Sequence, residues 1–247
     1  MAAAQQEHKT SRASTVQIVK TPLGMEAWLV EDYTVPLVAL DFAFTAGAAQ
    51  DPQGKAGVTN IMAGLLDEGA GELTADAFHQ ALDETAVELS FNAGLDAFSG
   101  DLKTLTRHTG EAFELLRKAI NEPRFDDDAI ERLRSQVIAG LKRESTDPDS
   151  MVAKAWREAA FGDHPYGRSS SGDLKSVPAI TREDIVAVHK RLFARSNLKI
   201  AAVGAIDAAK LAVLLDSTFG ALPAGPDLVP IRDVTPAEDM RKVIDLD

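Results

Sequence analysis

The spacing of apolar residues changes at Gly57 from every second position to every third or fourth position. Before this point, Val35–Thr45 places Val38, Leu40, Phe42 and Phe44 on one side of an extended chain, which predicts a strand with one buried face. After it, Gly57–Glu68 carries apolar residues at helical spacing, which predicts a helix ending at Gly69. A chain with both periodicities in separate blocks is expected to form a sheet covered by helices.

The same reasoning assigns the remaining elements. Strands are expected at Thr15–Lys20, Met25–Glu31, Val87–Phe91, Asp96–Leu105 and Leu198–Ala205. Helices are expected after Thr74, near Gly110–Asn121, after Asp126–Asp128, over Ser150–Phe161, after the cap residue Thr181, and over Asp207–Phe219. Runs of strands and runs of helices predict an α+β fold, with a mostly antiparallel sheet and helices packed on one face.

The chain divides into three parts by composition. Residues 1–14 are small and polar and are expected to be disordered, whereas residues 15–222 form one α+β domain. Residues 223–247 are rich in proline and glycine and predict a linker. The sequence Val243–Leu246 reads as the start of a strand at which the chain stops, so we expect a second half to follow.

Charge excludes several classes of partner. The 247 residues include 38 acidic and 26 basic side chains, a net charge of −12, and this balance disfavours nucleic acids and anionic lipid surfaces. The longest uncharged stretch, Ala56–Leu66, is too short to span a membrane. With no cysteine, the chain forms neither disulfides nor thiolate zinc sites.

The first residues of the chain give an indication of the cellular compartment. They lack the basic and then apolar segments of a signal peptide, but Ala2–Gln6 resembles the small-residue remnant left after signal cleavage. We therefore expect a periplasmic protein of bacterial origin, with a cytoplasmic protein as the alternative.

Histidine placement argues against a metal site of another kind. None of the five histidines pairs with another at a spacing of three or four residues, and zinc without cysteine needs several histidines or carboxylates. No Ser/His/Asp arrangement or phosphate-binding loop is recognisable. We interpret His79, His108 and His189 as surface or packing residues.

Several short strings, in a shared order, resemble one half of the M16 peptidase family, which includes pitrilysin, insulinase and the mitochondrial processing peptidase. The matching strings are Val35–Phe42 with Ala46–Ala48, Asp51–Gly57, Ser90–Ala93, Asp147–Pro148, Phe161–Arg168 and Arg195–Asn197. The resemblance implies that family's fold and places this chain at its N-terminal half.

The important departure from the family pattern lies at the metal site. Active members carry His-x-x-Glu-His on the first helix, where two histidines hold zinc and the glutamate activates water. By the resemblance, the two histidine positions are Asn60 and Gly64, the glutamate position is Ala63, and the third ligand falls near Gly140. We expect no zinc in this chain.

A half without zinc ligands can still have a role in this family. The resemblance implies a catalytically silent subunit of a two-subunit zinc metallopeptidase, paired with a zinc-bearing homologue or with itself and lining a chamber that holds a peptide substrate. Candidate substrate-binding residues are Asn92, Ala93, His164 and Tyr166, although His164 also suits a role in ordering its loop. An extended peptide is expected to add to Asp96–Leu105 as an edge strand.

Two further hypotheses stay open. One is a structural homologue with no peptidase role, like the silent core subunits of a respiratory complex. The other is a metal-independent hydrolase on the same fold, for which the sequence offers no nucleophile and base at a recognisable spacing.

Overall fold

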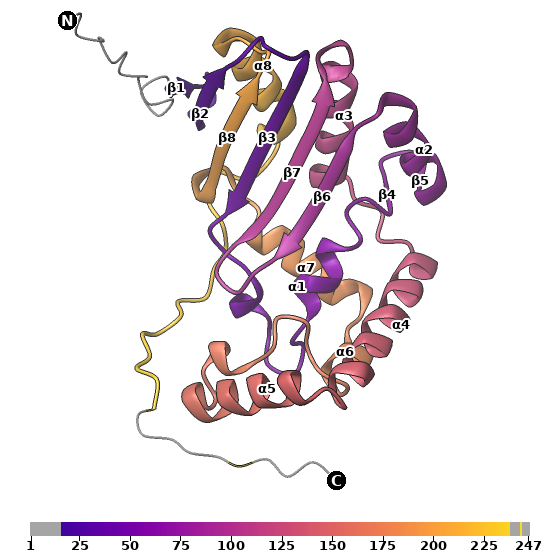
Figure 1. The fold of residues 1–247 in the computed structure, drawn as a ribbon, viewed down its shortest axis with the longest axis vertical. Helices are drawn as coiled ribbons and strands as arrows, with labels where there is room; N and C mark the ends of the chain where they lie inside the picture. The colour runs from indigo at the N-terminus through magenta and orange to yellow at the C-terminus, as the bar shows by residue number, and fades with distance from the viewer. Residues whose placement is uncertain (1–15, 238–242, 244–247) are drawn as a thin grey trace, which may run out of the picture.

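A six-stranded sheet forms the centre of the molecule in the computed structural model, which describes residues 16–237 and residue 243 (Figure 1). Its strands are β1 (Gln17–Lys20), β2 (Glu26–Glu31), β3 (Leu37–Phe44), β6 (Glu88–Ala93), β7 (Phe98–Leu105) and β8 (Leu198–Gly204). They lie in the order β1-β2-β8-β3-β7-β6, and all neighbours are antiparallel except β2 and β8. The predicted mostly antiparallel sheet is confirmed.

Helices cover one face of this sheet, as the α+β prediction requires, and two further helices lead away from it. The helices are α1 (Val58–Ala63), α2 (Ala75–Thr85), α3 (Thr109–Asn121), α4 (Asp127–Glu144), α5 (Pro148–Phe161), α6 (Ser176–Ala179), α7 (Arg182–Leu192) and α8 (Ala208–Phe219). Short turns of 3-10 helix are η2 (Ala48–Gln50), η3 (Thr106–His108), η4 (Pro165–Gly167) and η5 (Arg195–Asn197), and β4 (Gly69–Ala70) pairs with β5 (Leu73–Thr74). In Figure 1, α3, α7 and α8 lie behind the sheet.

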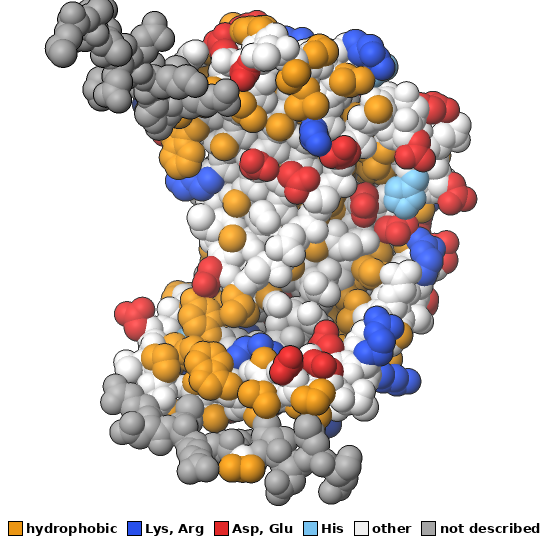
Figure 2. Space-filling model, in the orientation of Figure 1, with side chains coloured by type: hydrophobic (Ala, Val, Ile, Leu, Met, Phe, Trp, Pro, Cys, Tyr) orange, Lys and Arg blue, Asp and Glu red, His pale blue; other side chains and the backbone are white. Residues whose placement is uncertain are grey.

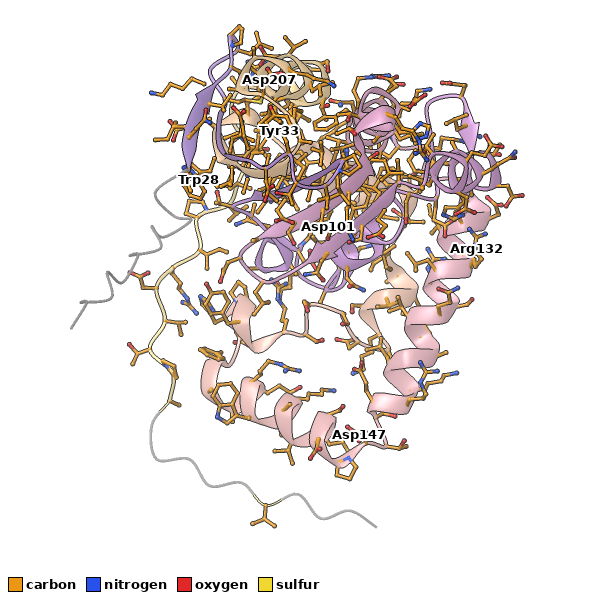
Figure 3. All side chains as sticks on the ribbon, turned by 45° about the horizontal axis from the view of Figure 1, so that its top comes forward. Trp28, Tyr33, Asp101, Arg132, Asp147 and Asp207 are labelled. Carbon is orange, nitrogen blue, oxygen red and sulfur yellow. The ribbon has the colours of Figure 1, made fainter. Side chains whose placement is uncertain are left out.

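The core lies between the sheet and these helices. The predicted inward side of β3 is buried throughout, from Val38 to Phe44, and the ring of Phe44 stacks on Phe193 with centroids 4.4 Å apart. The opposite face of the sheet is open, and Trp28 on β2 is 53% exposed there. Figure 3 shows Trp28 and Asp101 on different parts of this sheet.

The first helix is shorter than its apolar pattern predicts. The expected helix ran over Gly57–Glu68, but α1 ends at Ala63, and the chain continues as turns with Leu65 and Leu66 fully buried. Helical spacing alone could not show this end, because buried turns and helices both place apolar residues inward. The capping box of Thr181 and Asp184 is present at the start of α7, as predicted.

The expected edge strand is wrong. Asp96–Leu105 was expected at an edge, but β7 lies between β3 and β6, and the edge at this side is β6. Asn92 and Ala93, which were placed in the connection before that strand, are the last two residues of β6. Two consecutive strands of a hairpin cannot be ordered from their sequences alone, because either one can pair with β3.

An arm projects from the body, and an extended segment runs beside it. Helix α4 leads away from the sheet, and α5 turns back at Asp147, with only Ala160 buried among its residues (Figures 1 and 3). After α8, residues 221–237 contain no helix or strand and run past α5. Residues 1–14 and the strand expected near residue 243 fall largely outside the described residues.

Over residues 16–237, no helix combines the length and the hydropathy that a membrane crossing requires.

Candidate functional site

The three motif positions on the first helix offer no metal-binding chemistry. Ala63 is buried and ends α1, and Gly64 follows it as the C-cap, with its N–H donating to the carbonyl oxygen of Asn60 at 3.3 Å. An alanine and a glycine carry no donor atom for a metal, and a single asparagine is a weak ligand for zinc compared with imidazole. These side chains do not fit a catalytic zinc ion.

The long helix α4 places an apolar side chain against this site. A Cβ atom added to Gly64 would lie 2.9 Å from Leu133 Cδ2 and 3.2 Å from Leu133 Cδ1. Gly140, the expected third ligand position, lies two turns further along α4, and a Cβ atom there would meet only Arg143 within 4 Å. The structure therefore packs Leu133 against the residue at position 64.

No alternative metal site is evident in the part of the chain that the structure describes. Within those residues, no group of three or more histidine and carboxylate side chains is arranged to hold a metal ion. His189 Nε2 donates a hydrogen bond to the carbonyl oxygen of Ile120 at 2.8 Å, and burial lowers the pKa of its imidazole. This agrees with the packing role that the sequence suggested.

Asp51 fixes the start of α1 from within the protein. Its carboxylate accepts hydrogen bonds from the Gly57 N–H at 2.7 Å and from the Thr59 hydroxyl at 2.5 Å. Arg168 holds the same loop, because its guanidinium donates to the Asp51 carbonyl oxygen at 3.0 Å. Burial raises the pKa of the Asp51 carboxyl to about 6, although the hydrogen bonds from Thr59 and Gly57 act in the opposite direction.

The free edge of the sheet is β6, and the register identifies its unpaired backbone groups. The Gly94 N–H donates to the Ala97 carbonyl oxygen at 2.8 Å, and antiparallel pairs alternate between hydrogen-bonded and non-hydrogen-bonded. The backbone groups of Asn92 therefore face β7, whereas those of Ala93, Phe91 and Leu89 face away from the sheet. An extended peptide could pair with these outward groups.

A hollow lies next to this edge, between β6 and α2, and a second hollow adjoins it between α2 and α4. One of about 630 Å³ is lined by residues including Leu82, Val87 and Leu89, and a second of about 490 Å³ shares His79 with it. Their carboxylate residues are Glu68, Asp76, Asp83, Glu88, Asp101, Asp126 and Asp128. Glu68 pairs with Arg132, Glu88 with Lys103 and Asp126 with Arg124, so the negative charge of the hollows comes mainly from the other four carboxylates. Figure 2 shows acidic side chains around the histidine at this edge.

His164 and Tyr166 order their loop by hydrogen bonds. His164 is 1% exposed, its Nδ1 accepts from the Tyr166 N–H at 3.2 Å, and its Nε2 is 2.9 Å from the Arg232 carbonyl oxygen. Since Nδ1 accepts, the proton is on Nε2, which donates to Arg232. The Tyr166 hydroxyl donates to Asp96 Oδ1 at 2.7 Å, and this hydrogen bond raises the pKa of the phenol.

Sequence reasoning missed three residues that build this region. Gln50 is 9% exposed and bonds through its amide to the backbone of Val229, and Asp96 receives the Tyr166 hydroxyl. Arg168 was named only as part of a matching string, and it donates to the carbonyl oxygens of Ala49 and Asp51. The one signal was the string Phe161–Arg168, whose polar residues all lie in one short loop.

Comparisons with known proteins agree with this geometry. A family model described as "Insulinase (Peptidase family M16)" matches residues 28–173, and one described as "Peptidase M16 inactive domain" matches residues 179–245. The first model covers more than half of the chain.

Individual relatives match at low identity, and their names include both a non-peptidase homologue and peptidases. The chain is 23% identical over 195 residues to "Non-peptidase homolog YmxG" of Helicobacter pylori, which covers 79% of the chain and 45% of that protein. It is 20% identical over 214 residues to "Probable mitochondrial-processing peptidase subunit beta, mitochondrial" of Arabidopsis thaliana, covering 87% and 40%. The chain thus spans less than half the length of these curated relatives.

A solved structure shares the fold closely. The crystal structure of a peptidase M16 inactive domain from Pseudomonas fluorescens superimposes with a TM-score of 0.83 at 28% identity, covering 90% of this chain and 54% of that chain.

Proposed function

The chain belongs to peptidase family M16, and on this premise we propose that it is a catalytically silent half that holds peptide for a zinc site in another polypeptide. The single observation that carries the proposal is the absence of metal-binding side chains at the positions assigned to the zinc motif. Ala63 and Gly64 offer no ligand, and Leu133 occupies the space beside Gly64. A family model for an inactive domain and a relative named as a non-peptidase homologue support this interpretation.

A peptide-binding role is supported by the free edge of the sheet. The outward backbone groups of Leu89, Phe91 and Ala93 are available for pairing with an extended chain, and the hollow along Glu88–Ser90 leaves space beside them. In this arrangement Ala93 contacts peptide through its backbone, and Asn92 presents its exposed side chain on the open face. His164 and Tyr166 would act on this edge through their loop, since the Tyr166 hydroxyl donates to Asp96 in the turn after β6.

The partner that we propose is a zinc-bearing M16 homologue, with self-association as the alternative. One relative is named as a subunit, which supports an assembly of more than one chain. The peptide would lie in a chamber between the two partners, and we propose the periplasm as the compartment. Nothing in this arrangement calls for a cofactor bound to the present chain, since the zinc would be held by the partner.

Proline substitution at the free edge tests the peptide-binding role. Leu89→Pro removes an outward N–H, and Leu89→Ala removes the same side chain while it keeps that N–H. A fluorescein-labelled, unstructured Ser/Thr/Val peptide is titrated against each variant and followed by fluorescence anisotropy. We expect Leu89→Ala to bind like the parent and Leu89→Pro to lose binding.

Circular dichroism confirms that both variants are folded. If the parent chain binds no extended peptide, or if Leu89→Pro binds as well as Leu89→Ala, the peptide-binding role is wrong. A structural homologue without a peptidase role would then be the better description.

A further inference from the structure

The segment from Asp227 to Ala237 has no regular secondary structure but is attached to the body along its length. The Asp227 N–H donates to the carbonyl oxygen of Arg191 at 3.1 Å, and the Ala237 N–H donates to the carbonyl oxygen of Ala160 on α5 at 3.0 Å. We call residues 227–237 the strap. In Figure 1 it is the yellow chain that descends beside the sheet toward α5.

Two buried polar side chains hold the middle of the strap. The Gln50 amide donates to the Val229 carbonyl oxygen and accepts from the Val229 N–H, both at 2.9 Å, and His164 Nε2 donates to the Arg232 carbonyl oxygen at 2.9 Å. Gln50 is 9% exposed and His164 is 1% exposed. Without the strap, these buried groups would lose their partners, which is unfavourable in a low-dielectric interior. The body is therefore built to receive an extended backbone here.

Both side chains also connect to the turn between β6 and β7. Gln50 ends η2, whose Ala48 and Ala49 N–H groups donate to the carbonyl oxygens of Gly94 and Leu95, both at 2.9 Å. Gly47 permits this close approach, since a Cβ atom there would lie 2.3 Å from the Gly94 carbonyl oxygen.

The second connection runs through the loop after α5. His164 accepts from the Tyr166 N–H, and the Tyr166 hydroxyl donates to Asp96 at 2.7 Å. The Tyr166 ring also packs edge-on against Phe161 of α5, with centroids 5.9 Å apart. Two routes thus lead from the strap to residues 94–97, and Arg168 links them through its hydrogen bonds to the Ala49 and Asp51 carbonyl oxygens.

We propose that the strap controls the edge of the sheet: when it is seated on Gln50 and His164, it holds the β6–β7 turn and keeps β6 in position to receive a peptide. Lifting the strap removes the support of η2 and of the Tyr166 loop together. The turn then opens more often, and the outward backbone groups of Phe91 and Ala93 lose their fixed geometry. This inference rests on the proposed function for its consequence, but the coupling itself does not require that a peptide binds.

Proline at position 229 tests the coupling from the strap side. Val229→Pro removes the N–H that donates to Gln50, and Val229→Ala is the matched control because it keeps that N–H and the Val229 side chain is 61% exposed. The double variant Val229→Pro with Tyr166→Phe cuts one hydrogen bond in each route. Hydrogen exchange of the amides at residues 94–97 is measured by mass spectrometry in the whole chain.

We expect exchange at residues 94–97 to be about tenfold faster in the double variant than in the parent, because one part-buried and one exposed hydrogen bond are lost together, with a smaller increase in Val229→Pro. Val229→Ala should match the parent. Unchanged exchange at the turn in the double variant would overturn the inference.

Peptide titration separates the two proposals. If the parent binds the labelled peptide, the double variant should bind it several-fold more weakly, and equal binding despite a loosened turn would also overturn the inference. If the parent binds no peptide while the turn still loosens, the proposed function fails and the coupling stands.

Discussion

Leu133 on α4 fills the space directly in front of Gly64, where a Cβ atom would lie 2.9 Å from the leucine Cδ2. The position that the resemblance assigns to the second histidine therefore has no ligand, and any side chain there would require Leu133 to move. Recovery of a metal site in this chain would require changes on both helices.

Restoring a histidine at position 64 should therefore be destabilising. Gly64 has φ −77° and ψ 1°, which any residue can adopt, so the penalty comes from overpacking against Leu133 and not from the backbone. We expect Gly64→His to lower the free energy of unfolding by about 1–3 kcal/mol, as measured by urea denaturation.

A double-mutant cycle checks the cause. In the background Leu133→Ala, which itself costs stability, Gly64→His should be better tolerated than in the parent. If the cost of Gly64→His were the same in both backgrounds, the contact with Leu133 would not be its origin.

Substitution of Gly140, the position assigned to the third zinc ligand, should stabilise the protein. It lies inside α4, and an added Cβ atom would meet only the Arg143 guanidinium at 3.9 Å. Gly140→Ala should therefore raise the free energy of unfolding by up to about 1 kcal/mol, since alanine restricts the unfolded chain and favours the helix. Thermal unfolding measures this change in stability. A loss of stability would contradict the prediction and would mean that Gly140 is needed for packing.

Asp51 predicts a specific pH dependence. Because burial raises its pKa in the folded chain to about 6, above the value near 3.9 of an unfolded aspartate, folding favours the protonated carboxyl. Its contribution is fully present below about pH 4 and is lost as the pH rises through about 6, a change of about 2–3 kcal/mol.

The variant Asp51→Asn isolates this effect, because other carboxyls, such as Asp147, have lowered pKa values and act in the opposite direction. The difference in unfolding free energy between the parent and Asp51→Asn should fall between pH 4 and pH 7. A difference that is constant over this range would show that the carboxylate is not penalised by burial.

The acidic hollows predict a preference among peptides. At the β6 edge we expect a peptide with lysine at alternate positions to bind about tenfold more tightly than its neutral counterpart at low salt, from several weak charge pairs. The preference should disappear at about 1 M salt, where the Debye length is about 3 Å. Asp83→Asn should reduce it, whereas Glu144→Gln, on the far end of α4, should not.

Much of the fold was predictable because its periodicities are local. The inward face of β3, the capping box of Thr181 and the helix that starts after Asp126 follow from spacing and cap chemistry within a few residues. The end of α1 and the order of β6 and β7 were not predictable, because both depend on which distant surfaces cover them.

In the candidate site, too, local features were predictable from the sequence and long-range contacts were not. The loss of ligands at Ala63 and Gly64 can be read from a motif, but the contact of Gly64 with Leu133 joins two helices that are far apart in sequence. The Gln50 amide binds Val229 across 179 residues, and no local pattern distinguishes it from a surface glutamine.

Zinc content tests the central claim most directly. The purified chain is dialysed against buffer containing zinc and then against metal-free buffer, and its metal content is measured by inductively coupled plasma mass spectrometry. The account predicts no stoichiometric zinc, because the side chains of Ala63 and Gly64 offer no ligand atom and Leu133 packs beside Gly64. One zinc ion per chain, lost on replacing Asn60 by alanine, would contradict it.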